Sequence, residues 1–214
     1  MPHRAGEQGS LRRRAREALA RRELDAECKR LVALVRERCP EAFDPDPLPA
    51  GTVGPPLPVE RKRAVELLRL AAADGSLAHQ LWERDGDELL VHVGEIGMDT
   101  RDGLVQIDIP VSCDQTGPAR VLVAFAVGSA SRPAGMVAAT EGMPRGPTVV
   151  VEAWGDELVA LAWRALTTAL AAVARESGSD RDGAGLVPFG VESSPGGLLV
   201  RTMARHGFDR VGPR

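Results

Sequence analysis

The sequence predicts an α+β protein: a mostly antiparallel sheet of about five to six strands covered by a long buried helix near the C-terminus. Three observations support this prediction. Apolar runs typical of strands occur repeatedly between residues 77 and 154, and a long apolar-rich run follows at residues 156–176. Seven prolines between residues 40 and 58 separate this body from an Arg-rich N-terminal segment.

The prolines divide the chain into three expected parts. These are an Arg-rich amphipathic helical arm (residues 1–39), a Pro-rich spacer (40–58) and an α+β body (59–214). Each proline lacks a backbone N–H and disfavours helix at the preceding residue, so the spacer is expected to be extended.

The arm is expected to form a helix over residues 11–38, because its apolar residues recur at four- and three-residue steps. The residues on this stripe are Leu24, Cys28, Leu31 and Val35. The spacer follows at once, so the stripe has little to pack on locally. We therefore predict that these four residues bind a partner, which is the body, a second copy of the chain or a different protein.

Charge supports the same prediction. Of 27 Lys/Arg and 30 Asp/Glu residues, 11 and 6 lie in residues 1–39, leaving 16 and 24 in the remainder. The arm thus has a formal net charge of +5 and the remainder one of −8. A basic arm on an acidic body favours contact with an acidic partner, including the body itself.

The first part of the body is predicted to be a helix followed by strands. The helix should begin near Pro58, bury Val65, Leu68 and Ala72, and end at Asp74-Gly75. The expected strands are residues 77–83 and 88–94 around an Asp85-Gly86 hairpin turn, 104–109, 120–127 as a central strand, 135–140 as an edge strand, and 148–154.

The last third is predicted to contain two helices and a strand. The helix at residues 156–176 should bury Trp163, Leu166 and Leu170 against the strand that carries Val121, Val123 and Phe125. A strand is expected at residues 186–191, and a final helix at 198–206 with Gly207 at its C-terminal end.

Two histidines form one candidate metal site. If Asp85-Gly86 is a two-residue turn, His79 faces His92 across the hairpin, and two imidazoles could hold a metal ion. Cys113 or His206 could supply a third ligand only through folding, so a pair of strand histidines without metal is the favoured interpretation, and no metal is assigned.

No residue is assigned a catalytic or cofactor-binding role. Cys113 could be a reactive thiol at a strand end, but no base is evident for it. The chain has no G-x-S-x-G nucleophile motif, phosphate-binding glycine loop or dinucleotide fingerprint. The sequence therefore favours a non-enzymatic protein with no cofactor.

Nucleic-acid binding is an alternative role for the arm. Its arginines could neutralise phosphates without reading sequence. They are Arg12, Arg13, Arg14, Arg16, Arg21 and Arg22. Acidic residues are mixed among them and no aromatic residue is interleaved, so a solvated helix face is favoured instead.

The first alternative to an interaction protein, ahead of nucleic-acid binding, comes from the order of elements expected after residue 148. Strand, long helix, strand and helix, followed by Gly207-Phe208, are similar to the C-terminal half of GNAT-superfamily acetyltransferases. This resemblance implies an acyl-CoA-dependent acyltransferase. The position of the pyrophosphate-binding loop reads WGDELV, and the usual tyrosine acid falls near Met203, which implies a degenerate relative.

The leading functional prediction is an interaction or accessory protein, a scaffold or adaptor that docks through its N-terminal helix on a protein partner or on itself. Cys28, Cys39 and Cys113 are an odd number at no metal-ligand spacing, which favours a reducing compartment. The N-terminal residues have no apolar signal region. We therefore expect a cytoplasmic protein without a membrane partner.

Overall fold

The structure is a computed structural model and describes residues 54–73, 78–129, 138–139, 144–178 and 185–204. The predicted arm, with its stripe Leu24, Cys28, Leu31 and Val35, lies outside the described residues, as does most of the spacer. His206 and the Gly207-Phe208 pair also lie outside them. The body can therefore be compared with its predicted elements.

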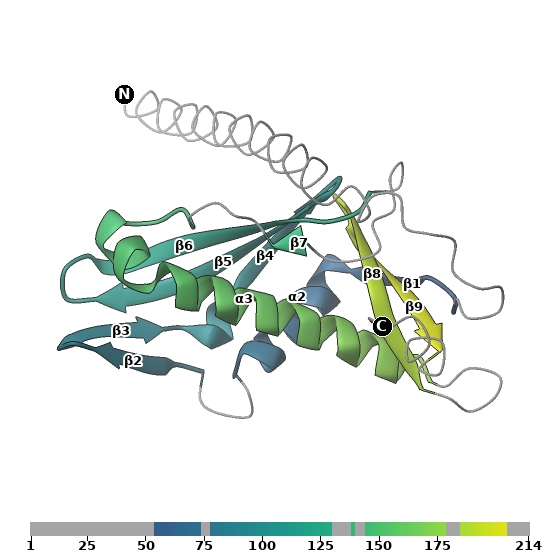
Figure 1. Ribbon diagram of the computed structural model, residues 1–214, viewed down its shortest axis with the longest axis horizontal. Coiled ribbons are helices and arrows are strands. Elements are labelled where there is room, and N and C mark those ends of the chain that lie inside the picture. Colours follow the sequence, from purple (N-terminus) through teal and green to yellow (C-terminus); the bar gives the residue numbers. More distant parts are fainter. Residues whose placement is uncertain (1–53, 74–77, 130–137, 140–143, 179–184, 205–214) are drawn as a thin grey trace, which may run out of the picture.

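The body is built from two antiparallel sheets and two long helices (Figure 1). In chain order the elements are β1 (Leu57–Glu60), α2 (Arg61–Ala73), β2 (Gln80–Arg84), β3 (Asp87–Val91), the 3-10 helix η2 (Val93–Glu95), β4 (Gly97–Arg101), β5 (Leu104–Cys113), β6 (Gly117–Ala126), β7 (Ala138–Ala139), α3 (Thr148–Glu176), β8 (Leu186–Ser194) and β9 (Gly197–Ala204). The predicted α+β class is confirmed.

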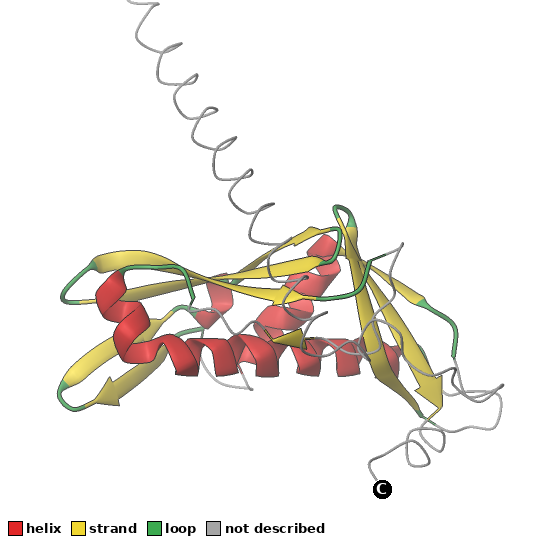
Figure 2. Cartoon of the chain, turned by 45° about the horizontal axis from the view of Figure 1, so that its top comes forward, coloured by secondary structure: helices red, strands yellow, loops and turns green. Residues whose placement is uncertain are grey.

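The strands form a six-stranded and a three-stranded sheet. The larger has the order β2-β3-β5-β6-β7 with β4 also paired to β5, and the smaller has the order β1-β9-β8. A parallel bridge between Gly128 and Glu192 connects them, with Gly128 N–H donating to Val191 O and Ser193 N–H donating to Gly128 O. Figure 2 shows α3 running along one face of the larger sheet and reaching the smaller one.

The core lies between α3 and the strands β5 and β6. Alternation along β5 buries Val105, Ile107 and Ile109 fully, as predicted, and Phe125 of β6 faces the same core. Leu166 and Leu170 of α3 are buried there. Trp163 packs against the predicted strand, with its ring centroid 5.7 Å from that of Phe125, but it is only partly buried.

The helix α2 packs on α3 at the end of the body where the smaller sheet lies. Its buried residues are Ala64, Leu67, Leu68 and Ala72, whereas the predicted core residue Val65 is half-buried. Arg63 donates two hydrogen bonds, of 2.8 and 2.9 Å, to the carboxylate of Glu176 at the end of α3. This hydrogen bonding, with the attraction of the carboxylate charge, raises the pKa of the Arg63 guanidinium above its usual value.

The strand predicted at residues 148–154 is wrong, because these residues are the first two turns of α3. Val150, Val151, Trp154 and Leu158 are buried at helical spacing against the sheet. β-branched residues have only a weak preference against helix, and this burial outweighs it.

The final helix predicted at residues 198–206 is also wrong. Residues Gly197–Ala204 form β9, which pairs with β8 on one side and β1 on the other. The first helix begins later than predicted. Leu57 and Pro58 belong to β1, which pairs with β9, and the helix begins at Arg61. The element order that carried the resemblance to acetyltransferases is therefore absent.

The other predicted strands are found in position: β5, β6 and β8 are longer than predicted, β2 and β3 are shorter, and the predicted strand 135–140 is described only at the two residues of β7. The strands β1 and β4 were not predicted. The hairpin pairs Gln80 with Val91 and Trp82 with Leu89, the register that the Asp85-Gly86 turn predicted. β6 lies between β5 and the two-residue β7, and its outward residues Leu122 and Ala124 are only partly buried, so the two faces of this strand are unequally covered.

The helix α3 is long and apolar enough to cross a membrane by length and composition alone. Core helices of soluble proteins meet the same criterion, and the buried residues of α3 belong to the core cluster described above. This property does not argue for a membrane span.

Candidate functional site

A groove runs between the edge strand β2 and the first half of α3. Its volume is about 530 Å³. The residues that line it are Gln80, Trp82, Glu83, Arg84, Trp154, Glu157, Ala160, Leu161 and Arg164. Among the described strands, β2 pairs only with β3 and so forms the edge of the larger sheet.

The floor of the groove contains two of the three tryptophans of the chain. The ring centroids of Trp82 and Trp154 are 6.1 Å apart, with planes inclined by 48°. Trp82 is half-buried and Trp154 is 6% exposed. Aromatic residues make up 3% of the chain, and two of them line this groove.

The local sequence explains how these side chains come together. Asp85 and Gly86 have φ angles of 53° and 89°, the left-handed conformations of a two-residue turn that reverses the strand. Alternation along β2 then places Trp82 and Arg84 on the same face. On α3, Trp154, Glu157 and Leu161 are spaced by three and four residues and so share one face of the helix.

Polar contacts join β2 to α3 and to α2. The guanidinium of Arg84 lies 4.7 Å from the centroid of the Trp154 ring, and its Nη1 is 2.6 Å from Glu157 Oε1. The side-chain amide of Gln80 donates to the carbonyl of Ala72, and the indole N–H of Trp82 donates to Gln80 Oε1 at 3.4 Å. The groove is thus held by contacts that leave Ala160 and Arg164 exposed at its rim.

The hairpin beside the groove is acidic. Residues 83–88 contain four acids, which are Glu83, Asp85, Asp87 and Glu88, and one base, Arg84, which pairs with Glu157. An apolar floor beside an acidic edge favours a ligand that is both apolar and basic.

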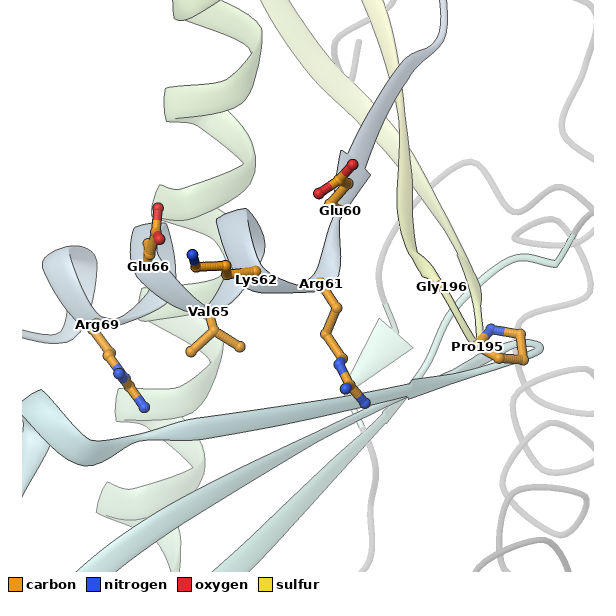
Figure 3. A pocket seen from close by; sticks show the side chains of 8 residues that line it. All are labelled: Glu60, Arg61, Lys62, Val65, Glu66, Arg69, Pro195 and Gly196. Carbon is orange, nitrogen blue, oxygen red and sulfur yellow. The ribbon is translucent and has the colours of Figure 1, made fainter.

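A second hollow, of about 660 Å³, lies beside the start of α2 and the turn between β8 and β9 (Figure 3). Arg61, Val65 and Arg69 point the same way from successive turns of α2. Arg61 Nη1 is 3.4 Å from Asp99 Oδ1, and Arg69 Nε donates to the carbonyl of Ile96 at 2.7 Å. Because two of its cations already have partners in the body, this hollow presents no concentrated charge to a ligand.

The predicted histidine pair is formed at the open end of the hairpin, opposite the Asp85-Gly86 turn. The Nδ1 atoms of His79 and His92 are 3.0 Å apart, and His92 Nε2 is 2.8 Å from Ser112 Oγ. Across the described residues no group of three or more His, Cys, Asp or Glu side chains is placed to hold a metal ion. The thiol of Cys113 is 3.2 Å from Thr116 Oγ1 instead of joining the histidines.

The predicted partner-binding stripe Leu24, Cys28, Leu31 and Val35 lies outside the described residues. No local signal in the sequence indicates the groove. The clustering of two scarce tryptophans depends on contact between β2 and the residues 148–154, which were expected to be a strand. Comparisons with protein-family models, curated proteins and solved structures found no match for this chain.

Proposed function

We propose that this chain is a non-enzymatic interaction protein whose groove between β2 and α3 receives a basic amphipathic helix. The observation that carries the proposal is the pair Trp82 and Trp154 at the floor of a groove with an acidic edge. Tryptophan and arginine are enriched among the residues that contribute most to binding at protein interfaces, and the half-buried Trp82 is the tryptophan that a ligand could contact.

The N-terminal arm has the chemistry that the groove requires. Its stripe Leu24, Cys28, Leu31 and Val35 has the spacing of a helix that inserts one apolar face into a groove. Its formal net charge of +5, from 11 basic and 6 acidic residues, complements the acids of the hairpin. The arm of the same molecule or of a second copy is therefore the occupant that we propose.

Light scattering on the full chain tests the proposal. Ala160→Arg places a long cation in the groove, and Thr168→Arg adds the same charge at another exposed position of α3, outside the groove lining. If a second copy supplies the arm, the wild-type chain and Thr168→Arg form oligomers that Ala160→Arg cannot form.

If the same molecule supplies the arm, the wild type and both variants are monomeric. The rate of tryptic cleavage after the arm arginines then distinguishes them. The arm is then cleaved more slowly in wild type and Thr168→Arg than in Ala160→Arg. Monomers with equally fast cleavage of the arm in all three would contradict self-docking. A different protein would then be the partner of the arm.

A further inference from the structure

The two histidines of the hairpin are aimed at each other from neighbouring strands. His79 and His92 continue the β2–β3 register, and their rings are nearly perpendicular, at 87°, with centroids 4.9 Å apart. His79 is exposed and His92 is half-buried.

The ring nitrogen of His92 that faces away from His79, Nε2, already has a partner. This atom lies 2.8 Å from Ser112 Oγ on β5, which fixes the orientation of the ring. Histidines that ligate metals commonly use their second ring nitrogen in such a hydrogen bond, which orients the ring. Because Nε2 contacts Ser112, Nδ1 is the nitrogen of His92 that faces His79.

We propose that His79 and His92 bind one divalent transition-metal ion through their Nδ1 atoms, with water as the remaining ligands. Metal–imidazole bonds are about 2.0–2.1 Å long. At the observed Nδ1 separation of 3.0 Å, such bonds meet at an angle of about 94°.

This angle selects among metals. It is near the right angle between neighbouring ligands of square-planar and octahedral ions, and below the tetrahedral angle that structural zinc adopts. Tetragonal nitrogen and oxygen sites are typical of Cu²⁺ and Ni²⁺. The pair is therefore suited to Cu²⁺ first and Ni²⁺ second, which is also the order of their general affinities.

The hydrogen bond and the metal compete for the same two atoms. The two Nδ1 atoms lie at hydrogen-bond distance, 3.0 Å, and a metal ion bound to both would replace this contact.

Calorimetric titration of the reduced full chain with NiCl₂ tests the proposal. Wild type should bind one Ni²⁺ at the pair, and His79→Ala or His92→Ala should each weaken this binding by roughly tenfold or more, since one protein ligand is lost. His206→Ala and Cys113→Ser are controls for other ligands and should bind as wild type does. Circular dichroism of each variant checks that the fold is kept.

Electron paramagnetic resonance of the Cu²⁺ complex identifies the ligands directly. Coupling to two imidazole nitrogens is expected in wild type and to one in either single variant. The proposal is overturned if wild type binds no Ni²⁺, or if the double variant His79→Ala/His92→Ala binds it as tightly as wild type does.

Discussion

Arg84 lies over the face of Trp154, with its guanidinium carbon 4.7 Å from the ring centroid. Arg84 is the last residue of the edge strand β2, and Trp154 lies in the second turn of α3. The same guanidinium pairs with Glu157 one turn further along the helix. One side chain therefore fixes the free edge of the larger sheet to the helix that forms the core, and it shapes the proposed binding groove.

Replacing Arg84 by alanine should destabilise the protein only slightly. The ion pair with Glu157 is largely exposed, so its loss together with the ring contact should cost about 1 kcal/mol. Urea denaturation measures this difference. Arg164→Ala, at the rim of the same groove, is the matched control and should leave the free energy of unfolding unchanged. An equal loss in both variants would show that Arg84 has no special role.

Alanine substitutions at the two glycines of the turn between β8 and β9 should differ strongly in their effect on stability. Gly197 has a φ of +151°, and a Cβ atom there would collide with the carbonyl oxygen of Val59 in the paired strand β1. Gly197→Ala should therefore cost on the order of 3 kcal/mol. Around its neighbour Gly196 there is open space, so Gly196→Ala should be nearly neutral. Thermal unfolding of the two variants checks the pairing of β1 with β9.

The buried carboxylate of Glu192 depends on Arg201. The side chain of Glu192 is 5% exposed, and both Nε and Nη2 of Arg201 lie 2.7 Å from its Oε1. Arg201→Ala leaves the carboxylate without this partner and should cost about 2 kcal/mol, less than for a fully buried pair because Arg201 is partly exposed.

Adding Glu192→Gln to that variant removes the stranded charge. The double variant should accordingly be more stable than Arg201→Ala alone in chemical denaturation. A double variant that is less stable than the single one would mean that the charge of Glu192 is satisfied by other groups.

Packing of α3 on the sheet is tested by Leu166. Its side chain is 1% exposed in the core, so Leu166→Ala should cost about 2–5 kcal/mol through lost burial and a residual cavity. Thr168→Ala, at an exposed position two residues further on, should change stability by less than about 0.5 kcal/mol. Comparable effects in urea denaturation would contradict the placement of this helix in the core.

Local sequence signals were sufficient to predict those parts of the fold that a single local interaction determines. The Asp85-Gly86 turn sets the register of its hairpin, and alternation along β5 identifies its buried face. These features depend on neighbouring residues or on a single period, so they can be read without knowing the rest of the fold.

The two wrong elements depend on distant partners. The run Val149, Val150 and Val151 favours strand locally, but it follows Pro147, and Val150 and Val151 continue the buried face of α3. Residues 198–204 were expected to be helical, yet they lie between β1 and β8, strands from opposite ends of the body in sequence. Tertiary pairing decided both cases.

The candidate groove could not be predicted for the same reason. Trp82 and Trp154 are far apart in sequence and meet only because residues 148–154 continue α3 alongside the edge strand. The histidine pair, in contrast, follows directly from the two-residue turn, so its position was predicted correctly.

Photo-crosslinking from the groove tests the central claim most directly. Benzoyl-phenylalanine placed at Ala160 in the full chain should crosslink to peptides from residues 11–39, and the same group at Thr168 should not. A dimer-sized product would place the arm of a second copy in the groove, and a monomer-sized product that of the same molecule. If the group at Ala160 reached no arm peptide, or if both positions gave the same products, the proposed docking of the arm in this groove would be contradicted.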